Sequence, residues 1–440
     1  MKISKKISIA ILFFTITTLN SYSQNLNTSK LDSLFKALDE KKLFMGSIAI
    51  SKNGNLIYSK SIGQANIETN KSLSIQTKYR IGSTAKIFTS ALVLKAVENK
   101  KITLDQTIDK FFPTIDQSDK ITIENLLNHR SGIHELLAAD EFTNGYTKAK
   151  SQDEMIAILS KFKVDFKPNS KADYSNSNYY LLTIILEKIY KKSYSDLLNE
   201  QIVKPLNLKN TYFGGKINLQ NNECYSYYFS DKWEKDSEGD MSVPLEAGAI
   251  VSNPVDLTIF IEKLFQGKII SPESLKKMTE IQDKYGMGIF ELPFYDKKGF
   301  VHRGQIDSFS SVLAYFPNEK LGIAITNNGA IYDKKKILIA SLSNYFNKPY
   351  KVNFKPFEPS ENQLDLYVGD YKNSDYPKII SITKNNKRLF ANFKDQSLFL
   401  IEPTEKNKFE NIWEGNKIEF TSNNEMIFQE NGNKYIFYKL

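Results

Sequence analysis

The chain of 440 residues contains one cysteine, Cys224, and three histidines. A lone cysteine cannot form an intramolecular disulfide even in an oxidising compartment, so stability must come from the hydrophobic core. The histidines, His129, His134 and His302, do not follow a metal-ligand spacing, which argues against a zinc or iron enzyme. We therefore expect no metal and no other cofactor, and we interpret Cys224 as an inert buried thiol.

The apolar run near the N-terminus is too short to cross a bilayer. It extends over 13 residues, Ile7–Leu19, whereas a spanning helix needs about 20. The run follows a lysine-rich start and precedes small polar residues that end at Ser23, which is the pattern of a secretory signal. We predict a cleaved signal peptide over residues 1–23 and export to the periplasm or the extracellular space, with an uncleaved anchor as the alternative.

Positive charge is only in mild excess, with 59 Lys and Arg against 50 Asp and Glu. The lysines are spread along the chain and form no basic stripe with interleaved aromatic residues, which argues against nucleic acid as a partner. The excess is compatible with weak contact to an anionic cell wall or membrane surface. The sequence also lacks a Gly-x-Ser-x-Gly segment, which excludes a Ser-His-Asp hydrolase built on a nucleophile elbow.

Two β-hairpin patterns stand far apart in the sequence. The first joins Gly46–Ser51 to Leu56–Ser61 through the turn pair Asn53-Gly54, and the second joins Ser310–Phe316 to Leu321–Thr326. Helical spacing of apolar residues is found at Leu31–Leu43, Ile123–Leu127, Met155–Phe162, Tyr179–Tyr190, Val255–Leu264 and Asp333–Phe346. We predict an α+β fold, in which an antiparallel sheet built from both ends of this segment is packed by helices and a helical lobe is inserted between them.

The pattern changes after residue 346. Residues 347–363 contain three prolines and little periodicity, which predicts a linker. Residues 364–440 contain short strand-like runs separated by turns, which predicts a small β-barrel or sandwich. These runs are Ile379–Thr383, Leu389–Phe393, Leu398–Ile401, Lys417–Phe420, Met426–Gln429 and Lys434–Tyr438. The mature chain is thus divided into a main domain over residues 24–346, the linker, and a β domain over residues 364–440.

The first candidate for chemistry is Ser83-Thr-Ala-Lys86, which follows Gly82 and opens the nearly all-apolar run Ile87–Val97. Residues three apart share one face of a helix, with about 5–6 Å between their Cβ atoms. A buried lysine loses proton affinity and can take the serine proton, while the helix N-terminus stabilises the developing oxyanion. Ser-x-x-Lys spacing also occurs, in polar or strand-like settings, at Ser33/Lys36, Ser160/Lys163, Ser274/Lys277 and Ser381/Lys384. The apolar helix therefore selects Ser83 as the nucleophile.

Two further segments carry candidate groups. Tyr174-Ser-Asn176 offers a phenol for proton transfer and an amide for a substrate amide, although an Asn-rich loop that caps a helix is the alternative. His302-Arg303-Gly304 precedes the second hairpin, where glycine would let a substrate backbone lie along a strand edge. The backbone N–H groups of Ser83 and Gln305 would then form an oxyanion hole.

In this order and spacing, the three segments resemble the Ser-x-x-Lys, Tyr-x-Asn and Lys-Thr-Gly (often His-x-Gly) boxes of the class C β-lactamase and penicillin-binding-protein superfamily. The resemblance covers roughly Leu31–Asn328. It includes supporting segments at Ile121–Ile133, Pro205–Leu208, Ala247–Asp256 and Tyr285–Gly288. The tail from Leu364 is similar to the lipocalin-like β domains that are often appended to such enzymes.

The resemblance implies an exported serine hydrolase that cleaves an ester or amide through an acyl-enzyme. Ser83 would be the nucleophile, Lys86 and Tyr174 would share the proton transfers, and Asn176 would contact the substrate. The substrate would be a D-amino-acid peptide, a small ester or a β-lactam. A catalytically idle module that binds or senses cell-wall peptide or lipid is the alternative.

Two departures from the family pattern matter. Asn169 stands where Pro-Gly is usual, and asparagine tolerates the left-handed backbone that such a turn needs. His302-Arg303 replaces Lys-Thr, which removes a fixed positive charge and a hydroxyl and puts β-lactamase activity in doubt. We expect His302, Arg303 and Gly304 to border the substrate, with a structural ion pair as the alternative role of Arg303. His129 and His134 fall where the family has a structural loop.

Overall fold

The computed structural model describes residues 26–139, 147–230, 232–243, 248–350, 359–376, 378–385, 388–393, 399–411, 416–430 and 433–440. The predicted signal peptide over residues 1–23 lies outside these ranges. Within them, no helix combines the length and the apolar character that crossing a bilayer requires.

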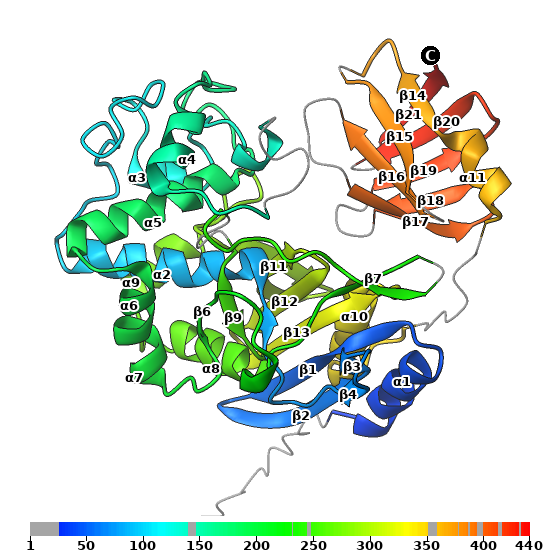
Figure 1. Ribbon diagram of the computed structural model, residues 1–440, viewed down its shortest axis with the longest axis horizontal. Helices are drawn as coiled ribbons and strands as arrows, with labels where there is room; N and C mark the ends of the chain where they lie inside the picture. Colours follow the sequence, from blue (N-terminus) through cyan, green and yellow to red (C-terminus); the bar gives the residue numbers. More distant parts are fainter. Residues whose placement is uncertain are drawn as a thin grey trace, which may run out of the picture.

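A six-stranded antiparallel sheet forms the centre of the main domain (Figure 1). Its order is β10 (Phe290–Phe294), β11 (Lys297–Ile306), β12 (Phe309–Phe316), β13 (Leu321–Ala330), β1 (Phe44–Lys52) and β2 (Asn55–Ile62). β1 pairs with β13, so the two predicted hairpins, although far apart in sequence, join in one sheet. The predicted α+β class is confirmed, including a sheet built from both ends of the segment.

The first hairpin turns as its sequence predicts. Asn53 and Gly54 have φ angles of 50° and 83°, the left-handed pair that matches a two-residue turn to the twist of the strands. β1 and β2 then pair from Lys52↔Asn55 to Gly46↔Ile62. The second hairpin, β12–β13, is also confirmed, with Phe316 opposite Leu321.

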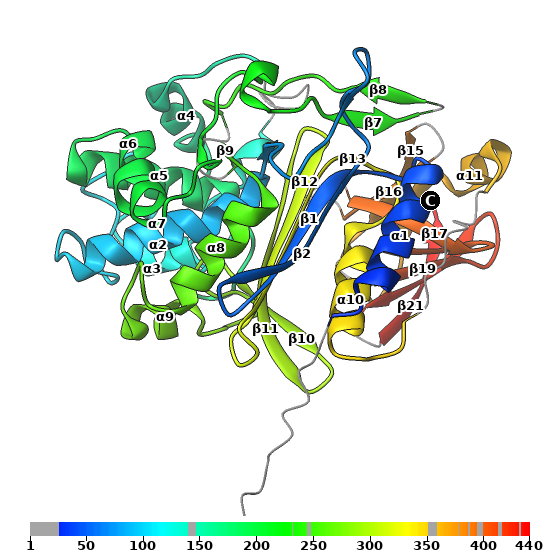
Figure 2. The same cartoon turned by 90° about the horizontal axis from the view of Figure 1, so that it is seen from below.

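Helices cover both faces of the sheet (Figure 2). α1 (Thr28–Glu40) and α10 (Lys334–Tyr345) lie on one face, and α2 (Ala85–Glu98), α5 (Asn176–Tyr190) and α8 (Pro254–Phe265) lie on the other. β12 contributes side chains to the cores on both faces, because successive residues of a strand point to opposite sides of the sheet. Val312 and Ala314 pack in the cluster with α1 and α10, whereas Leu313 and Tyr315 pack in the cluster with the other three helices. Side-chain direction along a strand therefore decides which face a residue serves.

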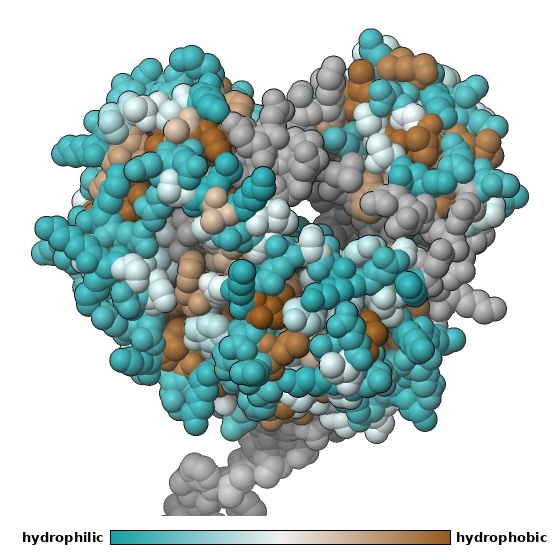
Figure 3. Space-filling view, in the orientation of Figure 1, coloured by the Kyte–Doolittle hydropathy of each residue, from teal (hydrophilic) through white to brown (hydrophobic). Residues whose placement is uncertain are grey.

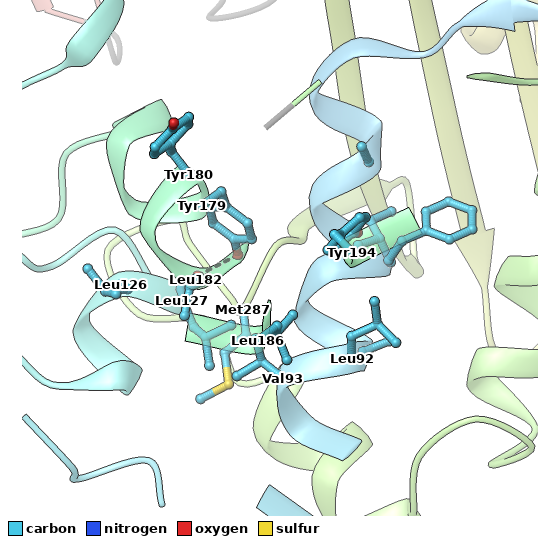
Figure 4. Packing of buried hydrophobic residues seen from close by; sticks show 14 of the residues in the cluster. Leu92, Val93, Leu126, Leu127, Tyr179, Tyr180, Leu182, Leu186, Tyr194 and Met287 are labelled. Atoms are coloured by element: carbon cyan, nitrogen blue, oxygen red, sulfur yellow. Dashed lines mark hydrogen bonds between the residues drawn. The ribbon is translucent and has the colours of Figure 1, made fainter. Parts of the chain in front are cut away.

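The helical lobe packs around α2 and α5. Figure 4 shows Val93 of α2 close to Leu186 of α5, and Tyr179 donates its hydroxyl to the Leu127 carbonyl at 2.7 Å. The other helices of this region are α3 (Ile123–Leu127), α4 (Gln152–Leu159), α6 (Tyr194–Leu198), the π-helix Asn199–Val203, α7 (Lys204–Leu206), α9 (Pro272–Met278) and the 3₁₀ turns Gly82–Thr84, Leu136–Ala138 and Leu219–Asn221. Small strand groups complete it: β3 (Gln64–Asn66) with β4 (Lys71–Ser72), β5 (Tyr79–Arg80) with β9 (Ile250–Ser252) and β6 (Tyr212–Phe213), and β7 (Tyr227–Phe229) with β8 (Trp233–Lys235).

Several helices begin one turn before the first apolar residue used to predict them. α4 begins at Gln152 because Ser151 and Glu154 form a capping box. α1 begins at Thr28 because Asn27 accepts the Lys30 N–H, and it ends at Glu40 instead of Leu43. Polar first turns are invisible to a hydrophobic period, which explains the shift.

The C-terminal residues form a closed barrel of eight strands in sequence order. They are β14 (Gly369–Lys372), β15 (Ile380–Asn385), β16 (Arg388–Phe393), β17 (Phe399–Glu405), β18 (Lys408–Asn411), β19 (Asn416–Phe420), β20 (Glu425–Glu430) and β21 (Asn433–Lys439). The predicted barrel is thus confirmed, but the sequence patterns do not predict β14 and β18, which are short and mostly polar. The predicted linker boundary at residue 363 falls inside α11 (Glu361–Tyr367), whose Leu364 and Tyr367 pack in the barrel core.

Hydrophilic residues cover most of the face seen in Figure 3, and apolar residues form only small separate groups on it. The largest exposed fractions among the described apolar side chains belong to Leu440, Tyr295 and Tyr438. Scattered exposed apolar residues are normal for a folded surface. The cores of the main domain and the barrel therefore take up the apolar pattern of the sequence.

Candidate active site

Ser83 lies where a 3₁₀ turn, Gly82–Thr84, leads into α2. Gly82 has a φ of 52°, and a Cβ atom there would lie 2.6 Å from the Gln305 nitrogen of β11. A side chain at this position would collide with backbone, so glycine lets the turn approach the strand. The approach brings the Gln305 amide beside the segment that carries Ser83, as the predicted oxyanion hole requires. Ser83 itself is partly exposed.

Lys86 contacts two of the predicted site residues. Its Nζ lies 3.0 Å from Ser83 Oγ and 2.8 Å from Asn176 Oδ1. Lys86 is fully buried, and this desolvation lowers its pKa to about 7, against a smaller opposing effect of the Glu135 charge. Near neutral pH a large fraction of Lys86 is therefore an uncharged amine in contact with the serine hydroxyl.

Tyr174 is half-buried beside the same pair of groups. Its hydroxyl hydrogen-bonds Ser83 and donates to Asn176 Oδ1 at 3.5 Å. Displacement of water raises the pKa of Tyr174, and the Glu135 charge raises it further. The tyrosine is a neutral phenol here, suited to relaying a proton and unsuited to standing as a phenolate. His129 fixes its plane by stacking on the ring at 4.6 Å between centroids.

Glu135 is a site residue that the sequence did not indicate. One carboxylate oxygen, Oε2, accepts the Asn176 backbone N–H at 2.5 Å, and the other, Oε1, accepts Asn176 Nδ2 at 3.0 Å and the Leu137 N–H at 3.1 Å. It lies 41 positions before Asn176, and a single glutamate next to an apolar segment gives no sign of so distant a partner. Only the fold brings the two together.

His302 of β11 is buried on the α2 side of the sheet. Its Nδ1 lies 2.7 Å from the Arg303 carbonyl, and because a carbonyl only accepts, Nδ1 carries the proton. Burial and the nearby Lys86 lower the pKa of His302 to about 3, so the ring is neutral and Nε2 is an acceptor. In the described part of the chain, Nε2 is buried without a hydrogen-bond partner. The third box therefore offers an acceptor where a lysine would offer a cation.

Arg303 is not brought to Ser83. Strand alternation puts it on the opposite face from His302, together with Val301, which packs in the cluster of α1 and α10. Its charge acts on Lys335 of α10, whose pKa it helps to lower after the larger effect of burial. This placement favours the structural alternative over a grip on substrate.

Gly304 also has a role within the fold itself. A Cβ atom at this position would lie 1.8 Å from the Ile81 carbonyl oxygen and 2.6 Å from Ser311 Oγ. The space beside Gly304 is filled by the segment that precedes Ser83. The glycine is therefore needed to pack β11 against the segment that leads into the turn Gly82–Thr84, whatever the substrate.

The residues interpreted as structural lie in supporting positions. Asn169 has a φ of 66° as expected, and its Oδ1 accepts Arg130 Nε at 2.8 Å. His129 Nδ1 lies 3.2 Å from the Ser175 backbone nitrogen, and burial holds its pKa well below the usual value. His134 Nδ1 lies 3.0 Å from Asp165, and Cys224 is buried.

Three of the four competing Ser-x-x-Lys pairs have an exposed lysine, and in the fourth Lys384 forms a salt bridge with Asp365. The Lys36 and Lys163 side chains are 76% and 88% exposed, and Lys277 is exposed as well. Their ammonium groups keep contact with water, unlike that of Lys86. Among the described residues, no group of three His, Cys, Asp or Glu side chains is placed to hold a metal ion.

The sequence matches a known family over most of its length and is similar to two curated proteins. The family described as Beta-lactamase matches residues 31–338. The chain is 25% identical to penicillin-binding protein 4* of Bacillus subtilis (strain 168) over 411 residues, covering 86% of this chain and 90% of that protein. It is also 25% identical to a teichoic acid D-alanine hydrolase of Staphylococcus aureus (strain MRSA252), covering 72% of this chain and 80% of that protein.

Solved structures share the fold. The octameric penicillin-binding protein homologue from Pyrococcus abyssi superposes with a TM-score of 0.66 at 23% identity, covering 93% of this chain and 100% of that one. D-amino acid amidase from Ochrobactrum anthropi SV3 superposes with a TM-score of 0.64 at 21% identity, covering 72% and 99%. The first similarity extends over nearly the whole chain, and the second over a smaller share of it.

Proposed function

Because the chain belongs to the β-lactamase family of serine hydrolases, we propose that it cleaves an ester or amide through an acyl-enzyme on Ser83. The substrate class that the site supports best is the D-aminoacyl ester or amide. One observation carries the proposal: the buried Lys86 amine, with its pKa lowered to about 7, lies 3.0 Å from Ser83 Oγ. An activated nucleophile needs a base in contact with it and a base pKa near the working pH.

Acylation follows from these contacts. The neutral Lys86 takes the proton of the Ser83 hydroxyl as Oγ forms a bond to the substrate carbonyl carbon. The carbonyl oxygen becomes an oxyanion that accepts the backbone N–H groups of Ser83 and Gln305. Tyr174 passes a proton to the leaving oxygen or nitrogen and regains one from the Lys86 ammonium, so the carbon–heteroatom bond breaks and the amine is neutral again.

Deacylation repeats the cycle with water as the nucleophile. Tyr174, whose pKa is raised, stays protonated at neutral pH, so Lys86 is the principal base and the tyrosine relays the proton. Water loses a proton through this pair as it attacks the acyl carbonyl, and Ser83 Oγ regains one as it leaves. The site thus returns to its initial protonation state without a cofactor.

The neutral His302 supports the substrate class. A substrate carboxylate needs a cation or hydroxyl donors, whereas His302 Nε2 only accepts and Arg303 lies on the other face of β11. An α-ammonium or amide N–H group suits such an acceptor. Two of the similar proteins are a teichoic acid D-alanine hydrolase and a D-amino acid amidase, whose names specify D-aminoacyl groups.

The location belongs to the same proposal. The signal-like residues 1–23 would direct the chain out of the cytoplasm. Outside the cytoplasm, D-alanyl esters of wall polymers and wall peptides are available as substrates. The mild positive charge would favour weak contact with an anionic wall or membrane surface. In the proposed division, the main domain covers residues 24–346, a linker covers residues 347–363, and the β domain covers residues 364–440.

Labelling with a fluorophosphonate tests this function against an idle binding module. We expect the wild type to gain one adduct in intact-mass spectrometry, on the peptide that contains Ser83, because Lys86 activates that hydroxyl. Ser83→Ala should lose the adduct and keep the melting temperature, while the matched Ser274→Ala should label normally. Absence of labelling in the folded wild type, or an adduct on another serine, would contradict the proposal. A fluorescent penicillin and a D-alanyl ester then distinguish the substrate classes.

A further inference from the structure

The hydrogen bonds of Glu135 define which atom of the Asn176 amide faces which neighbour. Three N–H groups point at the Glu135 oxygens: the backbone N–H and the Nδ2 of Asn176, and the backbone N–H of Leu137. Both oxygens of this carboxylate therefore accept hydrogen bonds, because each of the three groups is a donor. The atom of the Asn176 side chain that faces Glu135 is therefore the nitrogen.

The opposite end of the same amide faces the catalytic groups. With Nδ2 held by Glu135, Oδ1 points to Lys86 Nζ at 2.8 Å and to the Tyr174 hydroxyl at 3.5 Å. Lys86 Nζ in turn contacts Ser83 Oγ at 3.0 Å. A chain of contacts thus leads from Glu135 through Asn176 and Lys86 to the nucleophile.

The amide orientation matters because of what a neutral amine can offer. It has two N–H donors and one lone pair, and only the lone pair can take the Ser83 proton. When Asn176 Oδ1 accepts one N–H of Lys86, the lone pair is left for the serine. In the reversed orientation, Asn176 Nδ2 would donate into that lone pair and occupy it.

We propose that Glu135 is a positioning residue that fixes the Asn176 amide in one orientation and thereby keeps the lone pair of Lys86 directed at Ser83. The inference deepens the proposed function and rests on it, since it concerns how that base is held. Glu135 touches neither the nucleophile nor the carbonyl it attacks. Its effect reaches Ser83 through Asn176.

The groups around Lys86 also predict how Glu135 affects the pH profile. The Tyr174 and Tyr179 rings lie 5.1 and 5.4 Å from Nζ. His129, which follows α3, and His302 of β11 are neutral rings, because burial and the nearby Lys86 charge lower their pKa values. Glu135 is the carboxylate whose charge raises the pKa of Lys86. Removing this charge should lower the pKa, so the acid limb of the labelling rate should move to lower pH.

Glu135→Gln tests the proposal in the full-length chain. Glutamine keeps only one acceptor oxygen, which the fixed backbone N–H of Asn176 requires, so its NH2 group faces the Asn176 side chain. That side chain should then turn over, and its Nδ2 should occupy the Lys86 lone pair. We expect the second-order rate constant for fluorophosphonate labelling of Ser83, at its pH plateau, to fall about 100-fold, the scale of one general base. Glu154→Gln, the same change at the capping box of α4, should stay within about twofold.

A charge swap separates positioning from general damage. Asn176→Asp alone puts two carboxylates face to face and should be slow. Combined with Glu135→Gln, the aspartate accepts from the new glutamine on one oxygen and from Lys86 on the other, which restores the donor and acceptor pattern. The double variant should label at least about tenfold faster than either single variant. Its acid limb should move above that of the wild type, because the carboxylate now contacts Lys86.

The outcomes distinguish the inference from the function. A folded wild type that is not labelled refutes the proposed function itself. A wild type that is labelled, with Glu135→Gln equally fast or with its acid limb unmoved, refutes the positioning role. If Glu135→Gln does not fold, the double variant compared with Asn176→Asp decides, and lack of recovery there would overturn the proposal.

Discussion

A fully buried lysine is energetically unfavourable unless it loses its charge, and Lys86 does so in part. Desolvation lowers its pKa to about 7, which reduces the cost of burial and at the same time produces an amine that can accept a proton. The same burial keeps His302 neutral and Tyr174 protonated. At the scale of single residues, exclusion of water is thus the common cause of the site's protonation states.

Arg303 shows how the direction of one side chain decides a role. Its position next to His302 suggested a grip on a substrate carboxylate, but it lies on the α10 face. We predict that Arg303→Lys changes kcat/KM by less than about twofold for a carboxylate-bearing ester and a neutral ester alike, well under the 1.5–3 kcal/mol or so of a charged hydrogen bond to substrate. Steady-state kinetics with a matched ester pair would measure this. A selective loss on the carboxylate substrate would instead mean that the guanidinium reaches the cleft.

At the scale of elements, the candidate site depends on the contact between β11 and the turn Gly82–Thr84, which carries Ser83. Gly82 and Gly304 sit on the two sides of this contact, and neither has space for a Cβ atom. The contact brings the Gln305 amide beside the segment that carries Ser83, which is the arrangement that the proposed oxyanion hole needs. Two glycines that are far apart in sequence therefore both allow the close approach of β11 to the turn.

We predict that Gly304→Ala destabilises the main domain by about 1–3 kcal/mol or more, because the new methyl group would meet the Ile81 backbone. Labelling of Ser83 should slow as well, since the strand must move away from the turn. Gly215→Ala is the control, because a Cβ there has no neighbour within 4 Å. Thermal unfolding followed by circular dichroism measures the first effect. Equal melting temperatures for the two variants would show that β11 relaxes without cost.

The sequence predicted the elements better than their contacts. The Asn53-Gly54 turn and the apolar face of α5 have local signals, and both were placed correctly. Glu135 and the short polar strand β18 have none, because their partners are set by tertiary structure. The sheet face on which Arg303 lies depends on the alternation of side chains along β11, and an error of one residue in that alternation puts every side chain on the wrong face. Turns and helices with a local sequence signal can thus be predicted from sequence, whereas side-chain contacts between residues far apart in the chain cannot.

At the scale of the whole molecule, the barrel has its own core. Aromatic side chains such as Phe393, Phe409 and Phe428 fill it, and α11 packs on it through Leu364 and Tyr367. No described residue of the barrel belongs to the set around Ser83, which comes from the turn Gly82–Thr84, α2, the loops that carry Glu135 and Tyr174, the start of α5, and β11. The charge of Glu410 does act on Lys335 of α10, but α10 covers the sheet face opposite the site.

We therefore predict that a chain ending at Tyr350, before α11, still forms the Ser83 adduct at a rate within about threefold of the full-length protein. The physical reason is that acylation needs the turn Gly82–Thr84, α2 and β11, and the cores that pack these elements in the main domain include no residue beyond Tyr350 among those described. A chain ending at Ser360 should be labelled equally well. A chain ending at Asn385 would keep α11 and two strands of an open barrel, and it should aggregate, because the unpaired backbone groups at the strand edges can pair with other molecules. The measurement is fluorophosphonate labelling with size-exclusion chromatography. A shortened chain that folds but does not label would mean that the barrel completes the site.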